Sequence, residues 1–370
     1  MNKKIDLRNL TFEELKNWIT GLGLETYRAE QISRWIFQPD LQTFDQMTNL
    51  SRKWRGLFQE QAYLSQLIIL KVEKSSDGAR KFLFELEDGE HIESVLIPER
   101  GHYTLCVSSQ VGCAQRCRFC FTGKMGLKRN LKSSEIINQV LTVQGHLTET
   151  DPLLTNIVLM GMGEPLDNFE NTIRALKTLL SPFGMQFSHR HVTLSTAGLV
   201  PEMKALGNIL PVNLALSLNA ADDATRNRLM PINRKYPLDP LIQACKEFLL
   251  PHKKRITIEY ILIKGINDSP QAARSLAKLL SGVKAKINLI PFNAHPGVGF
   301  KPPDEEGLSK FQDILIRSQY TTIIRRSKGT DISAACGQLH ALWTGGSRPV
   351  LGGRQEKEGE RRGMKEEGRR

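Results

Sequence analysis

Three cysteines crowded into one loop constrain this chain more than any other feature of its sequence. Cys113, Cys117 and Cys120 are spaced C-x3-C-x2-C, between a strand-like run at 103–107 and a polar loop that contains glycine. Packing alone does not explain such a group of thiols, whereas closely spaced loop cysteines are the usual ligands of iron–sulfur clusters. A cubane normally takes four thiolates. With three, one iron keeps an open position that can bind and activate a small molecule, as a catalytic zinc does.

A structural zinc or a disulfide framework accounts less well for these cysteines. The zinc would need a fourth Cys or His at comparable spacing, and none follows soon after Cys120. Disulfides are unexpected in a chain of 370 residues without a secretory signal. The spacing therefore predicts an iron–sulfur cluster, with zinc as the main alternative.

Composition is that of a globular protein with a polyanionic partner. Hydrophobic residues make up 40% and charged residues 24%, and no apolar run approaches the length of a membrane span. Residues 1–4 lead into a polar helix and not into a signal sequence. With six cysteines and no sign of export, we expect a reducing cytoplasm. The net charge of +12 at pH 7 favours binding to a polyanion.

Residues 1–62 are expected to form a small helical domain. Thr11 and Glu14 match a capping box, in which the threonine caps a helix and the glutamate reaches back to it. Apolar residues follow at helical spacing. Basic residues along one edge make this unit a candidate RNA-binding domain. The expected helices begin at Thr11 and cover residues 26–37 and 43–62.

Residues 63–100 have a β-rich pattern, and we assign them to a connector. Turn residues at 76–78 and 88–89 separate three short runs that are rich in strand-forming residues. These runs cover residues 67–70, 81–85 and 91–97.

Residues 101–340 alternate between strand-like and helical segments, which predicts a parallel sheet with helical crossovers. Six such units fall short of the eight of a closed TIM barrel. The expected fold class is therefore α/β, a partial (β/α)6 TIM-like barrel with a small N-terminal helical domain. Residues 346–370 consist mainly of Gly, Arg, Lys and Glu and are expected to be a disordered tail. The predicted strands are 103–108, 156–160, 190–195, 212–218, 255–263 and 286–291, the helices between them are 134–147, 168–180, 200–206, 239–249 and 270–280, and a helix at 305–318 and a strand at 321–326 follow.

The cysteine loop and its flanks resemble a known family. The spacing C-x3-C-x2-C, with the aromatic Phe119 before the last Cys, resembles the radical S-adenosylmethionine (SAM) superfamily. The longer runs at 106–113, 120–126 and 129–131 resemble the RlmN/Cfr family of RNA adenine methyltransferases. The similarity covers most of the chain, from the N-terminal helices to Leu339. It implies a radical SAM barrel, a [4Fe–4S] cluster on Cys113, Cys117 and Cys120, and two SAM molecules per turnover.

Polar or small residues follow several predicted strands, at the end where parallel α/β sheets bind ligands. Glycines there let the backbone approach a ligand, and Glu164 could accept a hydrogen bond from an ammonium group. Isolated residues of this kind are more often turn formers, but four consecutive strand ends with such groups favour a polar cofactor. The resemblance implies that the SAM contacts are Gly163, Glu164, Ser195, Ser217, Leu218, Asn219 and Asn293.

Two cysteines outside the loop match the catalytic pair of the family. Taken alone, Cys106 and Cys336 would be buried apolar thiols, as we expect for Cys245. The resemblance implies that Cys336 accepts a methyl group from one SAM as a thiolate. A radical derived from a second SAM then activates this methyl group, and a covalent RNA adduct forms. Attack by Cys106 releases the product and leaves a Cys336–Cys106 disulfide.

Glu93 matches the position to which the family assigns proton handling. By default, however, a glutamate in a strand is a solvated residue of an exposed face. The chemistry of the residue alone does not identify the base.

The resulting hypothesis is methylation of carbon 2 of an adenine in 23S rRNA, with tRNA as a second substrate. Methylation of carbon 8 requires the same residues and stays open, as do a radical SAM enzyme with another substrate and a metal-stabilised RNA-binding protein without catalysis. The target base must leave its stack. We also expect flavodoxin or ferredoxin as the electron donor, a monomer, and no membrane partner. Phosphate contacts are expected from Lys124, Lys128, Arg129 and Lys132, from residues 253–255, and from Arg325, Arg326 and Lys328.

Overall fold

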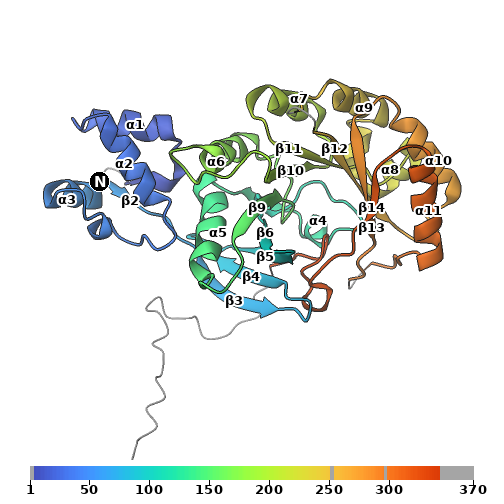
Figure 1. Ribbon diagram of the computed structural model, residues 1–370, viewed down its shortest axis with the longest axis horizontal. Helices are drawn as coiled ribbons and strands as arrows, with labels where there is room; N and C mark the ends of the chain where they lie inside the picture. The colour runs from blue at the N-terminus through green and yellow to red at the C-terminus, as the bar shows by residue number, and fades with distance from the viewer. Residues whose placement is uncertain (1–3, 251–253, 296–297, 342–370) are drawn as a thin grey trace, which may run out of the picture.

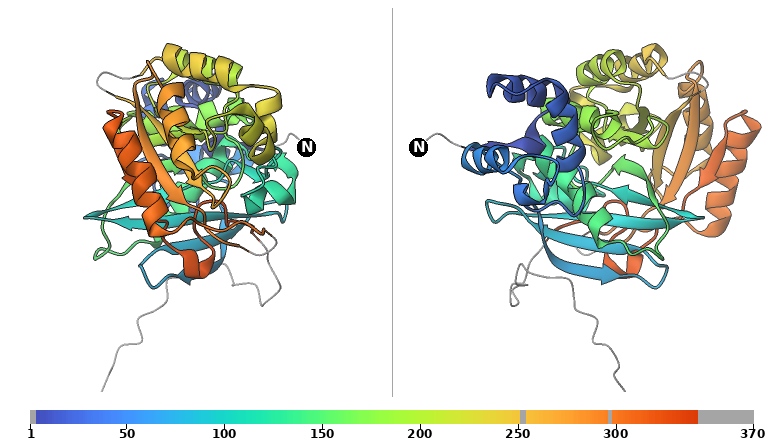
Figure 2. Two further views of the ribbon diagram at one scale, coloured as in Figure 1. Left: turned by 90° about the vertical axis from the view of Figure 1, so that its right-hand side faces the viewer. Right: turned by 60° about the vertical axis from the view of Figure 1, so that its left-hand side comes forward.

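A small helical domain packs beside a larger α/β domain whose sheet is covered by helices on its outer side (Figures 1 and 2). The structure is a computed structural model that describes residues 4–250, 254–295 and 298–341. The tail expected at 346–370 and the basic residue Lys253 lie outside the described residues. None of the described helices is both long enough and apolar enough to cross a membrane.

One ten-stranded sheet organises the larger domain, in the order β14-β13-β12-β11-β10-β9-β6-β5-β4-β3. Neighbouring strands from β6 to β14 run parallel. The strands β3, β4 and β5 pair antiparallel with one another, and β5 pairs antiparallel with β6. The ten strands are β3 (Ile68–Lys74), β4 (Arg80–Glu85), β5 (His91–Glu99), β6 (His102–Cys106), β9 (Leu154–Leu159), β10 (Val192–Thr196), β11 (Asn213–Ser217), β12 (Ile256–Leu262), β13 (Ala285–Pro291) and β14 (Thr322–Ile324).

The open α/β barrel predicted from the sequence is confirmed. Its six predicted strands correspond to β6 and to β9 through β13, and the strand predicted at 321–326 becomes a seventh parallel strand, β14. Residues 63–100, which the sequence assigns to a connector, contribute β3, β4 and β5 to the same sheet. The short turn at Arg100 and Gly101 joins β5 directly to β6, so no boundary separates these strands from the barrel.

Helices return the chain between successive parallel strands, as parallel pairing requires. Their apolar faces pack on the sheet in one continuous core that runs from Leu67 to Ala341. The barrel helices are α5 (Ser133–His146), α6 (Phe169–Leu180), α7 (Val200–Ile209), α8 (Asp223–Leu229), α9 (Leu238–Glu247), α10 (Pro270–Leu279) and α11 (Glu305–Arg317), with 3₁₀ turns η3 (Pro231–Arg234) and η4 (Thr330–Ile332).

The N-terminal domain has its own core, which runs from Leu7 to Leu64. The predicted capping box is present, because the Thr11 hydroxyl accepts from the backbone N–H of Glu14 and the Glu14 carboxylate accepts from that of Thr11. The single helix predicted over 43–62 is wrong. A 3₁₀ turn is followed by a further turn at 48–50, and Ser51 then caps a separate helix. The elements are β1 (Ile5–Asp6), η1 (Leu7–Asn9), α1 (Phe12–Gly21), α2 (Tyr27–Ile36), η2 (Phe44–Gln46), α3 (Arg52–Gln61) and β2 (Ala62–Tyr63).

A buried arginine joins the N-terminal domain to the barrel. The guanidinium of Arg8 donates to the backbone carbonyls of Ile36 (3.0 Å), Leu41 (2.9 Å) and Ser65 (2.9 Å). The Ser65 carbonyl also accepts from the side chain of Asn138 on α5, at 3.0 Å. Burial lowers the pKa of Arg8 to about 10. Three carbonyls at this junction therefore share one buried side chain as their donor.

Replacing Arg8 should destabilise the chain strongly. A buried carbonyl that loses its donor costs about 1–3 kcal/mol, so we expect Arg8→Met to lower the free energy of unfolding by at least about 3 kcal/mol in chemical denaturation. The matched control is Arg52→Met at an exposed position of α3, where surface substitutions change stability by about 0.5 kcal/mol or less. Equal effects of the two substitutions would contradict this role of Arg8.

Candidate active site

The cysteine loop is closed at its base by a short antiparallel ribbon. The strands β7 (Gln110–Gly112) and β8 (Leu127–Asn130) pair on either side of the loop, and the short helix α4 (Phe121–Met125) lies within it. The N–H of Cys113 donates to the carbonyl of Gly126 at 2.9 Å. Gly112 has φ +79°, and a Cβ atom there would lie 1.8 Å from the Gly126 oxygen. This position therefore requires glycine.

The three loop thiols line one cavity of about 310 Å³, which is located at the carboxyl ends of the parallel strands. Burial raises the pKa of all three, to about 12 for Cys113, and the neighbouring thiols repel one another as anions. Among the described residues, no group of three or more His, Cys, Asp or Glu converges on a single metal ion. A cubane does not require such convergence, because each thiolate binds a different iron. The predicted site residues that line this cavity are Cys106, Cys113, Cys117, Cys120, Gly163, Ser195, Ser217, Asn219 and Cys336.

Glu164 lies directly behind the cavity wall as a buried carboxylate. Its two oxygens accept from the backbone N–H groups of Ala197 (2.7 Å) and Leu166 (3.1 Å). Burial raises its pKa to about 7. In the part of the chain that the structure describes, no ion pair supplies it with a cation. An ammonium group placed beside it would favour its ionised form.

The neighbouring Gly163 lets this turn approach β7. It has φ +102°, and a Cβ atom there would lie 2.6 Å from the Cβ of Gln110. Gln110 in turn accepts from the N–H of Glu164 at 2.8 Å. The Gly163–Glu164 turn is thus held against the base of the cysteine loop.

Two of the residues predicted to contact SAM do not line the cavity and instead take part in hydrogen bonds that hold the backbone in place. Leu218 is buried, and its carbonyl accepts from the guanidinium of Arg226 at 3.0 Å. Asn293 donates its side-chain amide to the carbonyl of Cys336, at 3.1 Å, and to the hydroxyl of Ser327. Neither side chain is among those that line the cavity. Asn219 does line it, but its amide oxygen already accepts from the N–H of Ile261.

The segment that carries Cys336 is attached to the cysteine loop. The N–H of Phe121 donates to the carbonyl of Gly337 at 2.7 Å, and the Thr122 hydroxyl donates to that of Leu339 at 2.6 Å. Both donors follow directly after Cys120, the last cysteine of the loop. Although more than two hundred residues separate the partners in the sequence, these hydrogen bonds hold the segment of Cys336 against the cysteine loop.

Cys106 and Cys336 meet in this cavity. Burial raises the pKa of Cys106 most, and the nearby Cys336 raises it further. Removal from water by the surrounding protein also raises the pKa of Cys336. The residue nevertheless keeps some accessible surface, and it lines the cavity. The guanidinium of Arg325, which lines the same cavity, opposes the rise for both thiols. The two thiols are therefore close enough to influence each other's ionisation.

Glu93 is not the solvated strand residue of the default expectation. It is 4% exposed, pairs with the buried Lys81 at 3.2 Å, and accepts from the N–H of His340 at 2.9 Å. In β5 it shares a face with Val95 and Ile97, which line the cavity, because side chains alternate along a strand. Glu93 itself is not among the residues that line the cavity, but its carboxylate holds the segment that follows Cys336.

Sequence reasoning misses several residues of this site. It places Arg325 in a phosphate cluster, and it does not single out Glu259 at all. Glu259 lines the cavity from β12, and its Oε2 atom is buried without a hydrogen-bond partner among the described residues. A single acid inside the apolar run 256–262 is the available signal. For Lys81, which pairs with Glu93, the sequence carries no such signal.

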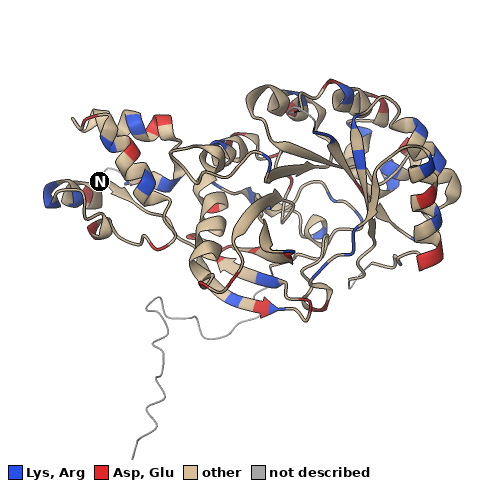
Figure 3. Cartoon of the chain, in the orientation of Figure 1, with Lys and Arg blue, Asp and Glu red and all other residues tan. Residues whose placement is uncertain are grey.

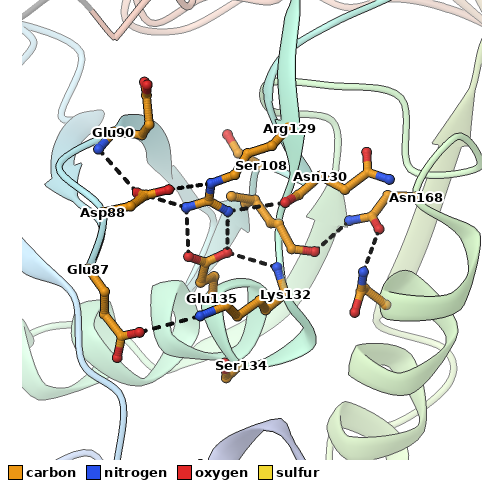
Figure 4. Close-up of polar contacts among 12 residues, drawn as sticks. Glu87, Asp88, Glu90, Ser108, Arg129, Asn130, Lys132, Ser134, Glu135 and Asn168 are labelled. Atoms are coloured by element: carbon orange, nitrogen blue, oxygen red, sulfur yellow. Dashed lines mark hydrogen bonds and ion pairs between the residues drawn. The ribbon is translucent and has the colours of Figure 1, made fainter.

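Three of the four predicted phosphate contacts next to the cysteine loop, Lys128, Arg129 and Lys132, are already paired within the protein, and Figure 4 shows this for Arg129 and Lys132. Lys128 binds Glu90 at 2.7 Å, and Lys132 approaches Glu87 at 3.4 Å. Arg129 binds both Asp88 and Glu135. Elsewhere, Lys and Arg are distributed over the N-terminal helices, the barrel helices and the edge of the sheet, instead of gathering on one element (Figure 3).

The fold and this cavity define a radical SAM enzyme, and the comparisons with known proteins agree. The family model "Radical SAM superfamily" matches residues 107–277, and "Ribosomal RNA large subunit methyltransferase N-terminal domain" matches residues 5–64. A solved radical SAM methyltransferase from Sphaerobacter thermophilus superimposes with a TM-score of 0.86 at 41% sequence identity, covering 91% of this chain and 100% of that one.

Curated relatives identify the family. "Dual-specificity RNA methyltransferase RlmN" from Desulfosudis oleivorans is 52% identical over 337 residues, with 91% of each chain covered. The protein of the same name from Syntrophus aciditrophicus is 50% identical over 336 residues, covering 91% of this chain and 96% of that one. The chain therefore belongs to the RlmN family of RNA methyltransferases, as its motifs predicted. Membership implies a [4Fe–4S] cluster and SAM, and the three thiols and the buried carboxylate of Glu164 fit these groups.

Substitution of Gly112 should disturb the metal site more than the fold. Gly112→Ala places a methyl group against the Gly126 carbonyl and displaces Cys113, so we expect the iron content per chain to fall several-fold. Gly101→Ala is the matched control, because Gly101 has φ +81° and no atom within 4 Å of a Cβ. The control should lose about 1–2 kcal/mol of stability from its backbone conformation alone and keep its iron. Equal iron contents, measured after anaerobic reconstitution, would refute the proposed constraint.

Proposed function

We propose that this enzyme methylates carbon 2 of an adenine in 23S rRNA and in tRNA through a methylated Cys336 and a transient Cys336–Cys106 disulfide. The observation that carries the proposal is the meeting of Cys106, Cys336 and the three loop thiols in one cavity. The printed names of the relatives support two RNA substrates and the RlmN branch of the family.

Both cofactors are assigned to this cavity. Cys113, Cys117 and Cys120 hold the cluster, and the Gly163–Glu164 turn holds SAM together with Ser195, Ser217, Leu218, Asn219 and Asn293. Glu164 binds the SAM ammonium group, whereas Leu218 and Asn293 act through the backbone that they fix. When bound, cluster and SAM supply a one-electron cleavage that yields a hydrogen-abstracting radical.

The two remaining thiols carry the methyl group and release the product. As a thiolate, Cys336 accepts a methyl group from one SAM, so that a C–S bond forms at Cys336 and a C–S bond of SAM breaks. After hydrogen abstraction, this carbon bonds to the adenine ring, and the ring gives up its C–H proton and one electron, which an oxidised cluster would accept. The thiolate of Cys106 then attacks the sulfur of Cys336, so that the C–S bond breaks and an S–S bond forms. The electron pair of the broken C–S bond stays on the carbon, which takes up a proton to become the product methyl group. A cellular thiol must reduce this disulfide with two electrons before the next turnover. Arg325 favours both thiolates by its charge.

Proton handling is assigned to Glu93. Its carboxylate is held by Lys81 and by the N–H of His340, at the cavity face that carries Val95. This placement supports a base whose oxygen is fixed in direction. Through its hydrogen bond with His340, Glu93 also positions the segment that follows Cys336 in the sequence.

The remaining assignments follow from the chemistry. A cluster of this kind needs an external one-electron donor, which we assign to flavodoxin or ferredoxin. We assign the enzyme to the cytoplasm as a monomer, and the free state of all six cysteines supports a reducing compartment.

Substitution of each catalytic cysteine should give a different product. Cys336→Ala removes the methyl carrier, so we expect neither methylated protein nor methylated RNA. Cys106→Ala removes the thiol that releases the product, so a covalent RNA–protein adduct should accumulate on denaturing gels. Cys245→Ala, in the buried thiol of α9, is the control and should retain turnover. Full product formation by Cys336→Ala would indicate another mechanism, and mass spectrometry of the RNA would reveal carbon 8 as the site if the rival assignment holds.

Loss of the Glu164 charge should weaken SAM binding. Gln at this position still accepts from the N–H of Ala197 but cannot attract the SAM ammonium group. Because 1.4 kcal/mol corresponds to a factor of ten, we expect Glu164→Gln to raise the dissociation constant of SAM by about 10–100-fold in equilibrium dialysis with the reconstituted enzyme. Glu170→Gln, at an exposed position of α6, should leave it unchanged. An unchanged dissociation constant of SAM in Glu164→Gln would show that Glu164 does not bind SAM.

A further inference from the structure

A second pocket lies on the other side of the cysteine loop. It has a volume of about 640 Å³, and its lining includes Arg116, Arg118, Lys124, Met125, Val298 and Phe300. Cys117 lines both this outer pocket and the inner cavity. A single cluster ligand thus separates a surface pocket from the space in which the chemistry takes place.

The outer pocket carries positive charge that the protein does not neutralise. Arg116 and Arg118 are exposed, and no ion pair joins them to any of the described residues. By contrast, three basic residues that follow the loop are bound by acids. Lys128 pairs with Glu90, and Figure 4 shows Arg129 with Asp88 and Glu135 and Lys132 with Glu87. Beside the cluster ligands, the two arginines therefore offer charge that remains available to a partner.

The loop backbone fixes these arginines, and apolar residues adjoin them. The N–H of Arg118 donates to the carbonyl of Leu229 at 2.9 Å. Phe300 packs edge-on against the buried Phe292, with 5.8 Å between ring centroids. Arginine together with aromatic residues is the composition that protein–protein interfaces favour.

The reactive cysteines lie in the inner cavity and not in the outer pocket. A base must reach Cys106 and Cys336, which line the inner cavity, and neither of them lines the outer pocket. An electron needs no opening, only a short distance to the cluster. The geometry therefore separates the two tasks, with RNA at the inner cavity and reduction at the outer pocket.

We propose that the outer pocket is the docking site of the one-electron donor, an acidic protein with a reduced flavin or iron–sulfur group near its surface. The proposal rests on the proposed function, because only a cluster bound to Cys117 needs an electron here. One electron leaves the donor group and enters the oxidised cluster, and no bond forms or breaks. Electron-transfer interfaces are small and steered by charge, which suits a pocket of this size and sign.

The proposal is tested by measuring how charge reversal in the outer pocket changes the binding of the donor protein. The probe is an acidic flavodoxin titrated calorimetrically into the reconstituted holoenzyme. We expect Arg116→Glu combined with Arg118→Glu to weaken binding at least about tenfold, and added salt to weaken binding of the unmodified chain, because exposed charges are screened. Arg274→Glu on the exposed side of α10 makes the same charge change elsewhere and should bind normally. The neutral pair Arg116→Gln and Arg118→Gln should be intermediate, with unchanged iron content.

Two reductants distinguish this role from RNA binding. With flavodoxin as the reductant, RNA methylation by the charge-reversed variant should fall at least as much as its affinity for the donor. With dithionite, which needs no docking site, methylation and RNA affinity should equal those of the unmodified chain. Losses with both reductants would assign the pocket to RNA, and normal flavodoxin binding would also overturn the proposal. If the unmodified chain methylates no RNA with either reductant, the proposed function fails, and the titration still decides on docking.

Discussion

One buried guanidinium fixes the carboxyl ends of two neighbouring strands on which the active site rests. Arg226 is fully buried and donates to the carbonyls of Ala197, after β10, and Leu218, after β11, and to the side chain of Asn233. Burial lowers its pKa to about 10, and its charge opposes the rise in the pKa of Cys117. Ala197 in turn donates to Glu164. Glu164 and Cys117 are thus both influenced by one buried charge, and removal of Arg226 would leave buried carbonyls unpaired.

The parts of this fold that follow from local patterns could be predicted from the sequence. Strand–helix alternation predicted the open barrel, and the Thr11–Glu14 spacing predicted a helix start that is present. The break before Ser51 was missed, because the intervening residues carry a helical apolar pattern while a serine cap competes for the backbone. The assignment of 63–100 to a connector used turn signals, which cannot show which strand pairs with β6.

The residues of the candidate site also fall into those that could be predicted from the sequence and those that could not. Spacing located the three loop cysteines, and family resemblance located Cys106 and Cys336; the structure brings all five into one cavity. Arg226, Lys81 and Arg325 act through contacts that exist only after folding, so no pattern in the chain marks them. The charge of Lys128, Arg129 and Lys132 was visible, but its compensation by acids of the β4–β5 turn and α5 was not. A basic sequence alone therefore overstates how much positive surface remains for RNA.

The hydrogen bonds from Phe121 and Thr122 to the Cys336 segment have a mechanical consequence. Both donors follow Cys120, the last cysteine of the loop, by one and two residues, so the turn after Cys120 and the segment of Cys336 form a single mechanical unit. On the proposed function, this unit contains both a cluster ligand and the methyl carrier. Any displacement of the turn after Cys120 would then displace Cys336 as well, which couples the geometry of methyl transfer to that of the cluster site.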